Sequence, residues 1–407
     1  MKLSEINKVL SFIEDKVIYP DISTIEGAST NPEITVNGEK VLIFCSNNYL
    51  SLATDPRIKE EMKKAVERYG MGSGGSRLVS GNTEIQGELE RKIAQFKGTE
   101  DAITFSTGYM ANTGVIPALL DPLAHSFVSY LKGKTFLRDT SVVFSDELNH
   151  ASIVDGIRLS RAEKIIYKHR DLDDLERLLK KASGYSRKLI ITDGVFSMDG
   201  DITPLGGIMG LGKKYDVVVM VDDAHATGVL GESGRGTAQH FHLQTPPDIT
   251  MGTFTKVFGG VGGFIAGTKE LIKYLRVTAR TYIFSAPIPP VIAAGLIKSI
   301  DIVSSEPQRR ERLWGNVSYL HEQLAKHDFD TLESQTQIIP IVIGDEKKAI
   351  TVSRRLLEKG YFIPCIRWPA VAHGASRLRL TLMADHTKEH MDGLVKALVS
   401  IKEELRF

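Results

Sequence analysis

Short apolar segments that alternate with helical patterns constrain the fold of this chain more than any other feature of the sequence. The segments are rich in β-branched residues and apolar throughout, which is typical of strands buried on both faces of a sheet. Helical patterns such as residues 171–183 separate most of them. This order indicates an α/β fold with a mostly parallel central sheet covered by helices. The predicted strands of that sheet are residues 101–105, 141–145, 163–168, 187–194, 216–223 and 248–254.

The chain has 407 residues, which is too long for a single hydrophobic core, so we expect more than one domain. Residues 1–44 are predicted as an N-terminal arm and helix, residues 45–287 as the large domain, and residues 288–407 as a smaller C-terminal α+β domain. The arm is predicted to be polar and irregular between its helix and about Lys40. The other predicted elements are helices over residues 3–18, 56–69, 347–359 and 388–405, a helical region ending near residue 327, and strands over residues 41–45, 338–344 and 377–382.

The composition excludes several classes of protein. Basic residues number 51 and acidic residues 50, so no overall field would recruit nucleic acid or a membrane surface. Two cysteines, Cys45 and Cys365, cannot form a disulfide framework and are predicted to be reduced thiols. The sequence has neither a signal-peptide pattern nor a run of about 18 apolar residues, so we expect a cytoplasmic protein without a membrane span. His240 and His242 could pair on a strand but fit a surface loop better, and no metal is predicted.

Three glycines, Gly70, Gly72 and Gly75, form the pattern G-x-G-x-x-G that occurs in dinucleotide-binding proteins. The pattern identifies such a site only where it follows a strand and opens a helix. Here it follows the helical segment 56–69, so we reject that interpretation. A loop whose backbone approaches a ligand closely and a plain flexible turn both remain open.

Two chemically reactive side chains follow predicted strands, at the edge where open α/β sheets bind ligands. Asp222 ends the segment 216–223, and a buried carboxylate there requires a cation such as a protonated ring nitrogen. The alternatives are a helix cap and a structural ion pair. Lys256 leaves the segment 248–254 into a glycine-rich loop, where desolvation would lower its pKa and favour an imine. The alternative is a solvated lysine beside a turn. The hydroxyl of Thr253 could bind phosphate.

Two further turns follow strands of the same predicted sheet. Gly108 and Tyr109 come after residues 101–105 and open a helix, where backbone amides bind phosphate or form an ordinary N-cap. His150 comes after residues 141–145, and its imidazole could stack on a flat ring or be structural. A phosphate cradle, a stacking group, an acid for a ring nitrogen and an imine-forming lysine thus follow strands of one sheet in chain order. Together they indicate one cofactor site.

Long segments of the sequence resemble the α-oxoamine synthases, a branch of the fold-type I pyridoxal-phosphate enzymes. The resemblance covers nearly the whole chain after about residue 40. It implies the fold-type I architecture, pyridoxal 5′-phosphate as cofactor, and a homodimer whose active sites lie at the subunit interface. The matching segments are CSNNYLSLA (45–53), GSGGSRLVSGN (72–82), STGYMAN (106–112), SDELNHASIVDGIR (145–158), TDGVFSMDGD (192–201), VDDAHATGVLGESGRG (221–236), GTFTKVFGGVGGF (252–264) and SRLRLTLMADHT (376–387).

The resemblance also implies roles around the cofactor ring. Lys256 would hold the cofactor as a Schiff base and then act on the substrate. Asp222 would pair with the ring nitrogen, and His150 would stack on the ring. His225 and Ser197 would lie near the ring hydroxyl oxygen.

Further residues would hold the phosphate and the substrate by the same resemblance. Thr253 and the amides of Gly108 and Tyr109 would bind the phosphate. Asn47 and Arg379 would bind the carboxylate of the amino acid, and an arginine fork suits that ligand on physical grounds.

The implied reaction joins a small amino acid to an acyl thioester, with release of the thiol and of CO2. Ser76 lies where the family lines the amino-acid pocket, and its small side chain leaves room for a methyl group. With the segment CIRWPAV (365–371), this favours L-alanine and a pimeloyl-type thioester of CoA or of an acyl carrier protein. The alternatives are glycine with acetyl-CoA, longer acyl chains as in serine palmitoyltransferase, an aminotransferase, and an inactive partner subunit. Intact Lys256, Asp222 and His150 argue against the last.

Three features depart from the family pattern. Gln86 stands where members often carry a histidine, and Asp21 falls where many carry an arginine. Residues 121–140 form an insertion of about fifteen residues, a length that often marks a functional loop. The first two departures leave the contacts with the acyl carrier open. The insertion fits either a surface that meets the acyl donor or a packing elaboration or dimer contact.

Overall fold

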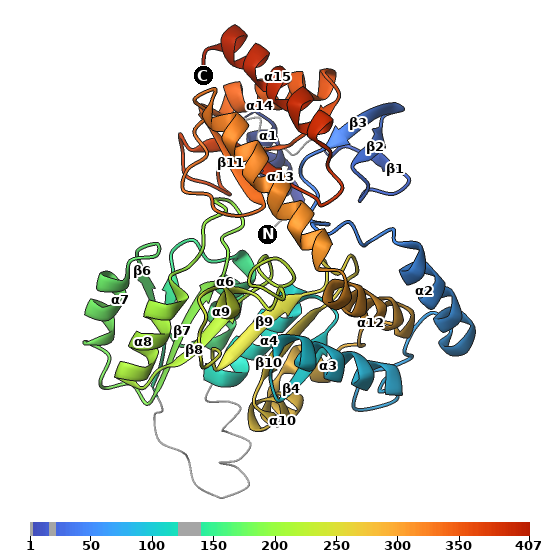
Figure 1. Ribbon diagram of the computed structural model, residues 1–407. Coiled ribbons are helices and arrows are strands. Elements are labelled where there is room, and N and C mark those ends of the chain that lie inside the picture. Colours follow the sequence, from blue (N-terminus) through green and yellow to red (C-terminus); the bar gives the residue numbers. More distant parts are fainter. Residues whose placement is uncertain (1–2, 16–21, 121–139) are drawn as a thin grey trace, which may run out of the picture.

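The computed structural model describes residues 3–15, 22–120 and 140–407. A central sheet with helices on both faces forms one layer system, and elements from both ends of the chain form a second group beside it (Figure 1). This arrangement confirms the predicted α/β fold class with a smaller C-terminal α+β part. Asp21 and all but the last residue of the predicted insertion lie outside the described residues. No described helix is long and apolar enough to cross a membrane.

The central sheet contains seven strands in the described part of the chain, in the order β4-β10-β9-β8-β7-β5-β6. Strand β10 is antiparallel to both its neighbours, whereas the other neighbouring strands are parallel. The parallel strands therefore end at one edge. The strands are β4 (Asp101–Phe105), β10 (Gly263–Gly267), β9 (Ile249–Thr253), β8 (Val218–Asp222), β7 (Arg187–Asp193), β5 (Ser141–Asp146) and β6 (Glu163–Tyr167).

Alternate side chains of the inner strands enter different hydrophobic cores. Val143 in β5 packs into the core under helices α4, α6 and α10, while Val142 and Phe144 pack into the core under α7 and α8. Both faces are dry, which explains the apolar strand sequences. The helices of this part are α2 (Pro56–Tyr69), α3 (Glu84–Lys97), α4 (Gly108–Leu120), α6 (Ala151–Ser160), α7 (Leu172–Leu179), α8 (Leu205–Tyr215), α9 (Thr237–His240), α10 (Lys269–Thr278), α11 (Arg280–Ile283) and α12 (Pro290–Ser305).

Two small sheets lie in the second group of elements. One has the order β11-β14-β13, and the other has the order β1-β2-β3-β12, in which β12 from the C-terminal part pairs in parallel with β3 from the arm. The arm is therefore joined to the C-terminal elements by a sheet. The elements are α1 (Leu3–Asp15), β1 (Ile25–Glu26), β2 (Glu33–Val36), β3 (Glu39–Ile43), α13 (Pro307–Ala325), β11 (Ile338–Gly344), α14 (Glu346–Glu358), β12 (Tyr361–Phe362), β13 (Cys365–Ile366), β14 (Ser376–Thr381) and α15 (Lys388–Leu405).

The prediction that the arm is irregular up to about Lys40 was wrong. Strands β1 and β2 lie in that stretch, and β2 pairs with β3 in a hairpin. The turn is Asn37-Gly38, and both residues have positive φ, which is the backbone that a tight two-residue hairpin requires. Ile34 and Val36 alternate into a small core, and this alternation with an Asn-Gly turn is a recognisable hairpin signal.

Strand β10 was also missed, because its sequence GFIAG lies in a stretch predicted only as a glycine-rich loop. The glycines serve close packing rather than flexibility. A Cβ atom on Gly263 would lie 2.6 Å from the Cα atom of Gly108. Strand β10 can therefore press against the start of α4 only without a side chain at that position.

The division into domains stays a prediction. The junction near residue 288 precedes α12, and Gly295 of that helix packs against Met62 and Ile58 of α2. The first helix of the predicted C-terminal domain thus contacts the predicted large domain.

Candidate active site

A cavity of about 260 Å³ lies at the carboxyl ends of the parallel strands. This is the edge where open α/β sheets bind their ligands. The structure brings all the predicted cofactor-binding residues together around it, although they come from separate turns of the chain. They are Gly108, Tyr109, His150, Ser197, Asp222, His225, Thr253 and Lys256.

Lys256 lies just after β9, where the chain leaves the sheet in a turn closed by the N–H of Gly259, which donates to the Lys256 carbonyl at 3.1 Å. Burial is the main cause that lowers the pKa of the Lys256 amine to about 8; Arg379 acts in the same direction, and Asp222 and Asp193 oppose it. The amine therefore loses its proton more readily than an ordinary lysine does, which favours a nucleophilic role.

Asp222 ends β8 and is only 4% exposed. Its Oδ2 atom accepts from Nδ2 of Asn112 at 2.8 Å, and its Oδ1 atom accepts from the N–H of Ala224 at 3.0 Å. Both donors are neutral, and Asp222 has no ion pair within the described residues. A buried carboxylate oriented in this way is suited to a cationic partner in the cavity.

His150 stands at the N-terminus of α6 and faces the cavity. Its Nδ1 atom accepts from the N–H of Ser152 at 3.2 Å, so the ring proton of the neutral imidazole is on Nε2. The hydroxyl of Ser152 also contacts Nδ1 at 2.7 Å and accepts from Asn112 at 2.9 Å. Burial lowers the pKa of His150. A hydrogen-bonded chain therefore joins the predicted stacking group to Asp222.

Asp193 is a further acidic side chain of the cavity, at the end of β7 and in register with Asp222. Its Oδ2 atom accepts from the backbone N–H of His150 at 2.8 Å. Burial, together with the Asp222 charge, raises the pKa of Asp193 well above its ordinary value. Asp193 holds the turn that carries His150.

The other end of the cavity is formed by backbone and hydroxyl groups. Gly108 begins α4, and a Cβ atom there would lie 3.3 Å from the Thr253 hydroxyl, so a larger residue would force a small shift of these two groups. The hydroxyls of Thr253 and Thr255 are 2.8 Å apart. Thr107 also lines this end. Hydroxyls beside a helix start form a phosphate cradle.

The predicted carboxylate-binding pair lies together on the C-terminal side of the cavity. Both terminal nitrogens of Arg379 are 3.4 Å from Oδ1 of Asn47, and its Nε donates to the carbonyl of Ser197. The hydroxyl of Tyr49 is 3.0 Å from the same Oδ1 atom and 2.7 Å from Nδ1 of His225. Burial, with Lys256 and Arg379 nearby, holds the pKa of His225 well below its ordinary value, so this imidazole is neutral.

Three predicted substrate-binding residues, Asn47, Ser76 and Arg379, are not among the residues that line this cavity. Arg379 contacts the lining residue Ser197 and is 3.4 Å from Asn47, whereas within the described residues Ser76 has no contact of this kind. It lies in the segment between α2 and α3, where its carbonyl accepts from the N–H groups of Val79 and Gly81. Gln86, the residue that departs from the family pattern, is fully buried. Its Oε1 atom accepts from the N–H and hydroxyl of Thr83, and its Nε2 donates to the carbonyl of Ile288. Gln86 thus caps α3 and does not line the cavity.

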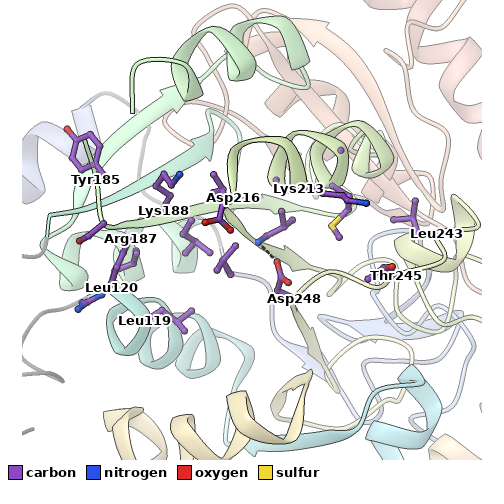
Figure 2. A pocket seen from close by; sticks show the side chains of 18 of the residues that line it. Leu119, Leu120, Tyr185, Arg187, Lys188, Lys213, Asp216, Leu243, Thr245 and Asp248 are labelled. Carbon is purple, nitrogen blue, oxygen red and sulfur yellow. Dashed lines mark hydrogen bonds between the residues drawn. The ribbon is translucent and has the colours of Figure 1, made fainter. Parts of the chain in front are cut away.

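A larger cavity of about 970 Å³ lies at the opposite, amino ends of β7 and β8 (Figure 2). Two of its charged side chains, Lys188 and Asp248, already have structural partners. Lys188 donates to the carbonyl of Tyr215 at 2.6 Å, and Asp248 accepts from the N–H of Val219 at 2.8 Å. This cavity lies at the amino ends of the strands, whereas Lys256, Asp222 and His150 lie at the carboxyl ends. No cluster of metal-ligating side chains exists among residues 3–15, 22–120 and 140–407.

Sequence reasoning missed Tyr49, Asn112 and Asp193. Asp193 follows the end of a strand, so the rule that found Asp222 applies to it as well. Asn112 lies four residues after Gly108, on the same face of α4, and helical spacing could have found it. No signal in the sequence predicts the contact of Tyr49 with a histidine 176 residues away.

Comparison with known proteins places these features in a family. Residues 39–398 match the profile of the aminotransferase class I and II family. An 8-amino-7-oxononanoate synthase of Thermoanaerobacter pseudethanolicus is 45% identical over 404 residues, covering 97% of this chain and 98% of the relative. The enzyme of that name from Geobacter sulfurreducens is 44% identical, covering 97% of each chain.

Solved structures agree with this placement. A structure of SPT with a PLP internal aldimine has a TM-score of 0.91 at 30% identity, covering 100% of this chain and 99% of the other. An 8-amino-7-oxononanoate synthase of Francisella tularensis has a TM-score of 0.74 at 28% identity, covering 90% and 98%. The chain therefore belongs to the aminotransferase class I and II family of fold-type I enzymes and, within it, to the α-oxoamine synthases.

Proposed function

We propose that this chain condenses L-alanine with a pimeloyl-type thioester and releases the thiol and CO2, which is the 8-amino-7-oxononanoate synthase reaction of biotin biosynthesis. One observation carries the proposal. A half-buried lysine and a buried carboxylate without an ion-pair partner in the described structure face one cavity, in a chain whose relatives of that name are 42–45% identical over nearly its whole length. The enzyme is a pyridoxal-phosphate-dependent acyltransferase.

The residues of the cavity fit pyridoxal 5′-phosphate. Asp222 supplies the anion for a ring nitrogen, His150 a flat ring for stacking, and Lys256 the amine for covalent attachment. Thr253 and the amides at Gly108 supply the phosphate cradle. When bound, this cofactor withdraws electrons from the Cα atom of an amino acid and so allows a new carbon–carbon bond there.

The chain's own residues bind the amino acid and move its proton. Arg379 and Asn47 orient the substrate carboxylate, which places the Cα–H bond toward the amine of Lys256. With its pKa near 8, that amine accepts the Cα proton. Asp222 keeps the ring nitrogen protonated, because loss of that proton would leave the carboxylate buried without a cation.

The pocket for the amino-acid side chain requires a second copy of the chain in this proposal. Ser76 lies outside the cavity of its own subunit, which supports a homodimer in which it faces the partner's site. The small hydroxyl leaves space for the methyl group of L-alanine. The cytoplasmic location and the choice between CoA and an acyl carrier protein as donor stay predictions.

A second candidate is condensation with a longer acyl chain. The solved structures with TM-scores of 0.90 and 0.91 include a serine palmitoyltransferase of Sphingomonas wittichii and the SPT structure. Their identity of 30% is well below the 42–45% of the oxononanoate synthases compared by sequence, so this candidate ranks second.

A thiol-release assay over a panel of substrates tests the proposal. L-Alanine, glycine and L-serine are each combined with pimeloyl-, acetyl- and palmitoyl-CoA. L-Alanine with pimeloyl-CoA should give the highest kcat/KM. Because one methyl group is worth only about 1–3 kcal/mol in a pocket, slower turnover of glycine is expected. The highest value with glycine and acetyl-CoA, or with L-serine and palmitoyl-CoA, would overturn the assignment.

A further inference from the structure

Tyr49 connects two parts of the active site that have separate tasks. Its hydroxyl lies 3.0 Å from Oδ1 of Asn47 and 2.7 Å from Nδ1 of His225. The side chain is fully buried, so water does not compete for the hydroxyl. On one side lies the proposed carboxylate-binding pair Asn47 and Arg379, and on the other the histidine proposed to face the cofactor ring.

The hydroxyl has one proton, so it can donate to only one of these two neighbours at a time. If Tyr49 donates to His225, the Nδ1 atom accepts, and the proton of this neutral ring is on Nε2. If Tyr49 donates to Asn47, then Nδ1 of His225 carries the proton and donates to the Tyr49 oxygen. The Nε2 atom is then an acceptor. The direction of one hydrogen bond therefore decides whether His225 offers a donor or an acceptor to its ligand.

Arg379 influences that choice through Asn47. Both terminal nitrogens of Arg379 lie 3.4 Å from Oδ1 of Asn47, which is long for a hydrogen bond. The Tyr49 hydroxyl is 3.0 Å from the same oxygen. A substrate carboxylate that binds the Arg379 fork withdraws these donors from Asn47. The Asn47 oxygen then becomes a better acceptor for Tyr49, which favours the Nδ1-protonated form of His225.

We propose that Tyr49 is a positioning residue that sets the tautomer of His225 according to whether a carboxylate occupies Asn47 and Arg379. This inference rests on the proposed function for the roles of Arg379 and His225. Its consequence is that binding of the amino acid prepares the ring-facing histidine before the thioester arrives.

The test uses propionate, which has the carboxylate and methyl group of L-alanine but no amine. The cofactor-loaded protein is prepared with ¹⁵N-labelled histidine, and the His225 signals are assigned by their loss in His225→Gln. Saturating propionate should increase the ratio of Nδ1–H to Nε2–H forms roughly fivefold, a change that one hydrogen bond can produce. In Tyr49→Phe, propionate should still compete with L-alanine, but the ratio should not change.

Tyr167→Phe is the matched control, because Tyr167 is also fully buried but lies in the core under α7 and α8. Its response to propionate should equal that of the wild type. Asn47→Asp is a second variant, since a carboxylate at that position should hold the Tyr49 proton and fix the Nδ1–H form without propionate.

If propionate still changes the His225 tautomer ratio in Tyr49→Phe, Tyr49 does not set that tautomer and the proposal is overturned. Loss of propionate binding in Tyr49→Phe would also overturn it, because Tyr49 would then only support the shape of the pocket. If Tyr49→Phe does not fold, a wild-type-like tautomer ratio in Asn47→Asp would overturn it. No thioester is present in these measurements, so failure of the proposed condensation is detected separately by thiol release.

Discussion

Lys256 is the residue proposed to attach the cofactor, and its surroundings change the pKa of its amine. Burial and Arg379 lower the pKa of its amine to about 8. The rate at which the cofactor-free chain attaches pyridoxal 5′-phosphate should therefore rise as the pH rises through about 8 and then level off. Arg379→Gln should move this inflection to higher pH, because it removes a neighbouring positive charge. An inflection near the ordinary lysine value in the wild type would contradict this assignment.

Asp222 is proposed to hold a positive charge on the cofactor ring. Asp222→Asn keeps the shape but removes the anion, so kcat should fall by about 10²–10³, the scale of one lost electrostatic stabiliser. Asn112→Ala removes only the neutral donor that orients the carboxylate, and its loss should be about tenfold. Steady-state kinetics with both substrates test this order. Near wild-type turnover of Asp222→Asn would show that the ring nitrogen needs no anion.

Among the elements, the loop between β7 and α8 is held by side chains from distant parts of the chain. Arg379 donates to the carbonyl of Ser197, and Arg377, two residues earlier on the same face of β14, donates to Asp199 at 2.6 Å. At the other end of the loop, His169 bridges Asp201 at 2.8 Å and Asp146 at 2.9 Å. These contacts fix the loop that carries Ser197 into the cavity.

His169 should stabilise this loop in a pH-dependent way. Burial alone would lower its pKa, but hydrogen bonds with Asp146 and Asp201 outweigh that effect and raise it from 6.5 to about 10. The stabilisation is therefore complete below pH 6.5 and is lost as the pH rises toward about 10. His169→Gln should lower the free energy of unfolding by about 1.5–3 kcal/mol near pH 6 and by less at higher pH.

Denaturant unfolding at several pH values measures this difference. The exposed His240 supplies the control variant His240→Gln, which should unfold like the wild type at every pH. A constant difference between His169→Gln and wild type from pH 6 to pH 10 would contradict the charged bridge.

Elements with a strong local pattern could be predicted, and those formed by distant contacts could not. The six apolar segments all became strands, because burial on both faces requires continuous apolar sequence. Strand β10 escaped prediction because its glycines are explained by Gly108, which is remote in sequence. In the same way, Lys256 and Asp222 were found because they follow strands. Asn112 contacts Asp222, and Tyr49 contacts His225, only after folding brings distant segments together, so these two partners were not predicted.

At the scale of the whole molecule, the proposed pocket for the amino-acid side chain needs two copies of the chain. The segment around Ser76 exposes Met71, Leu78 and Val79 at 89, 63 and 84% in the single chain. Apolar side chains exposed together are typical of a surface that a partner covers. This supports the proposal that Ser76 completes the active site of the other subunit.

Complementation between two inactive variants tests that arrangement. Lys256→Ala removes the attachment point, and Ser76→Trp fills the pocket that Ser76 is proposed to line. A mixed dimer has one site with both defects and one intact site, so co-refolded variants should recover about a quarter of wild-type activity. No recovery, with mixed dimers demonstrated by two affinity tags, would place Ser76 in its own subunit's site.

The central claim is that this molecule forms a carbon–carbon bond at the Cα atom of L-alanine and releases its carboxylate. Incubation with pimeloyl-CoA and L-alanine labelled with ¹³C in the carboxyl group measures this directly. The proposed reaction should release one labelled CO2 for each free thiol. The amino-ketone product should contain the methyl and Cα carbons of alanine and no label. Retention of the label in the product, or formation of pyruvate without thiol release, would contradict it.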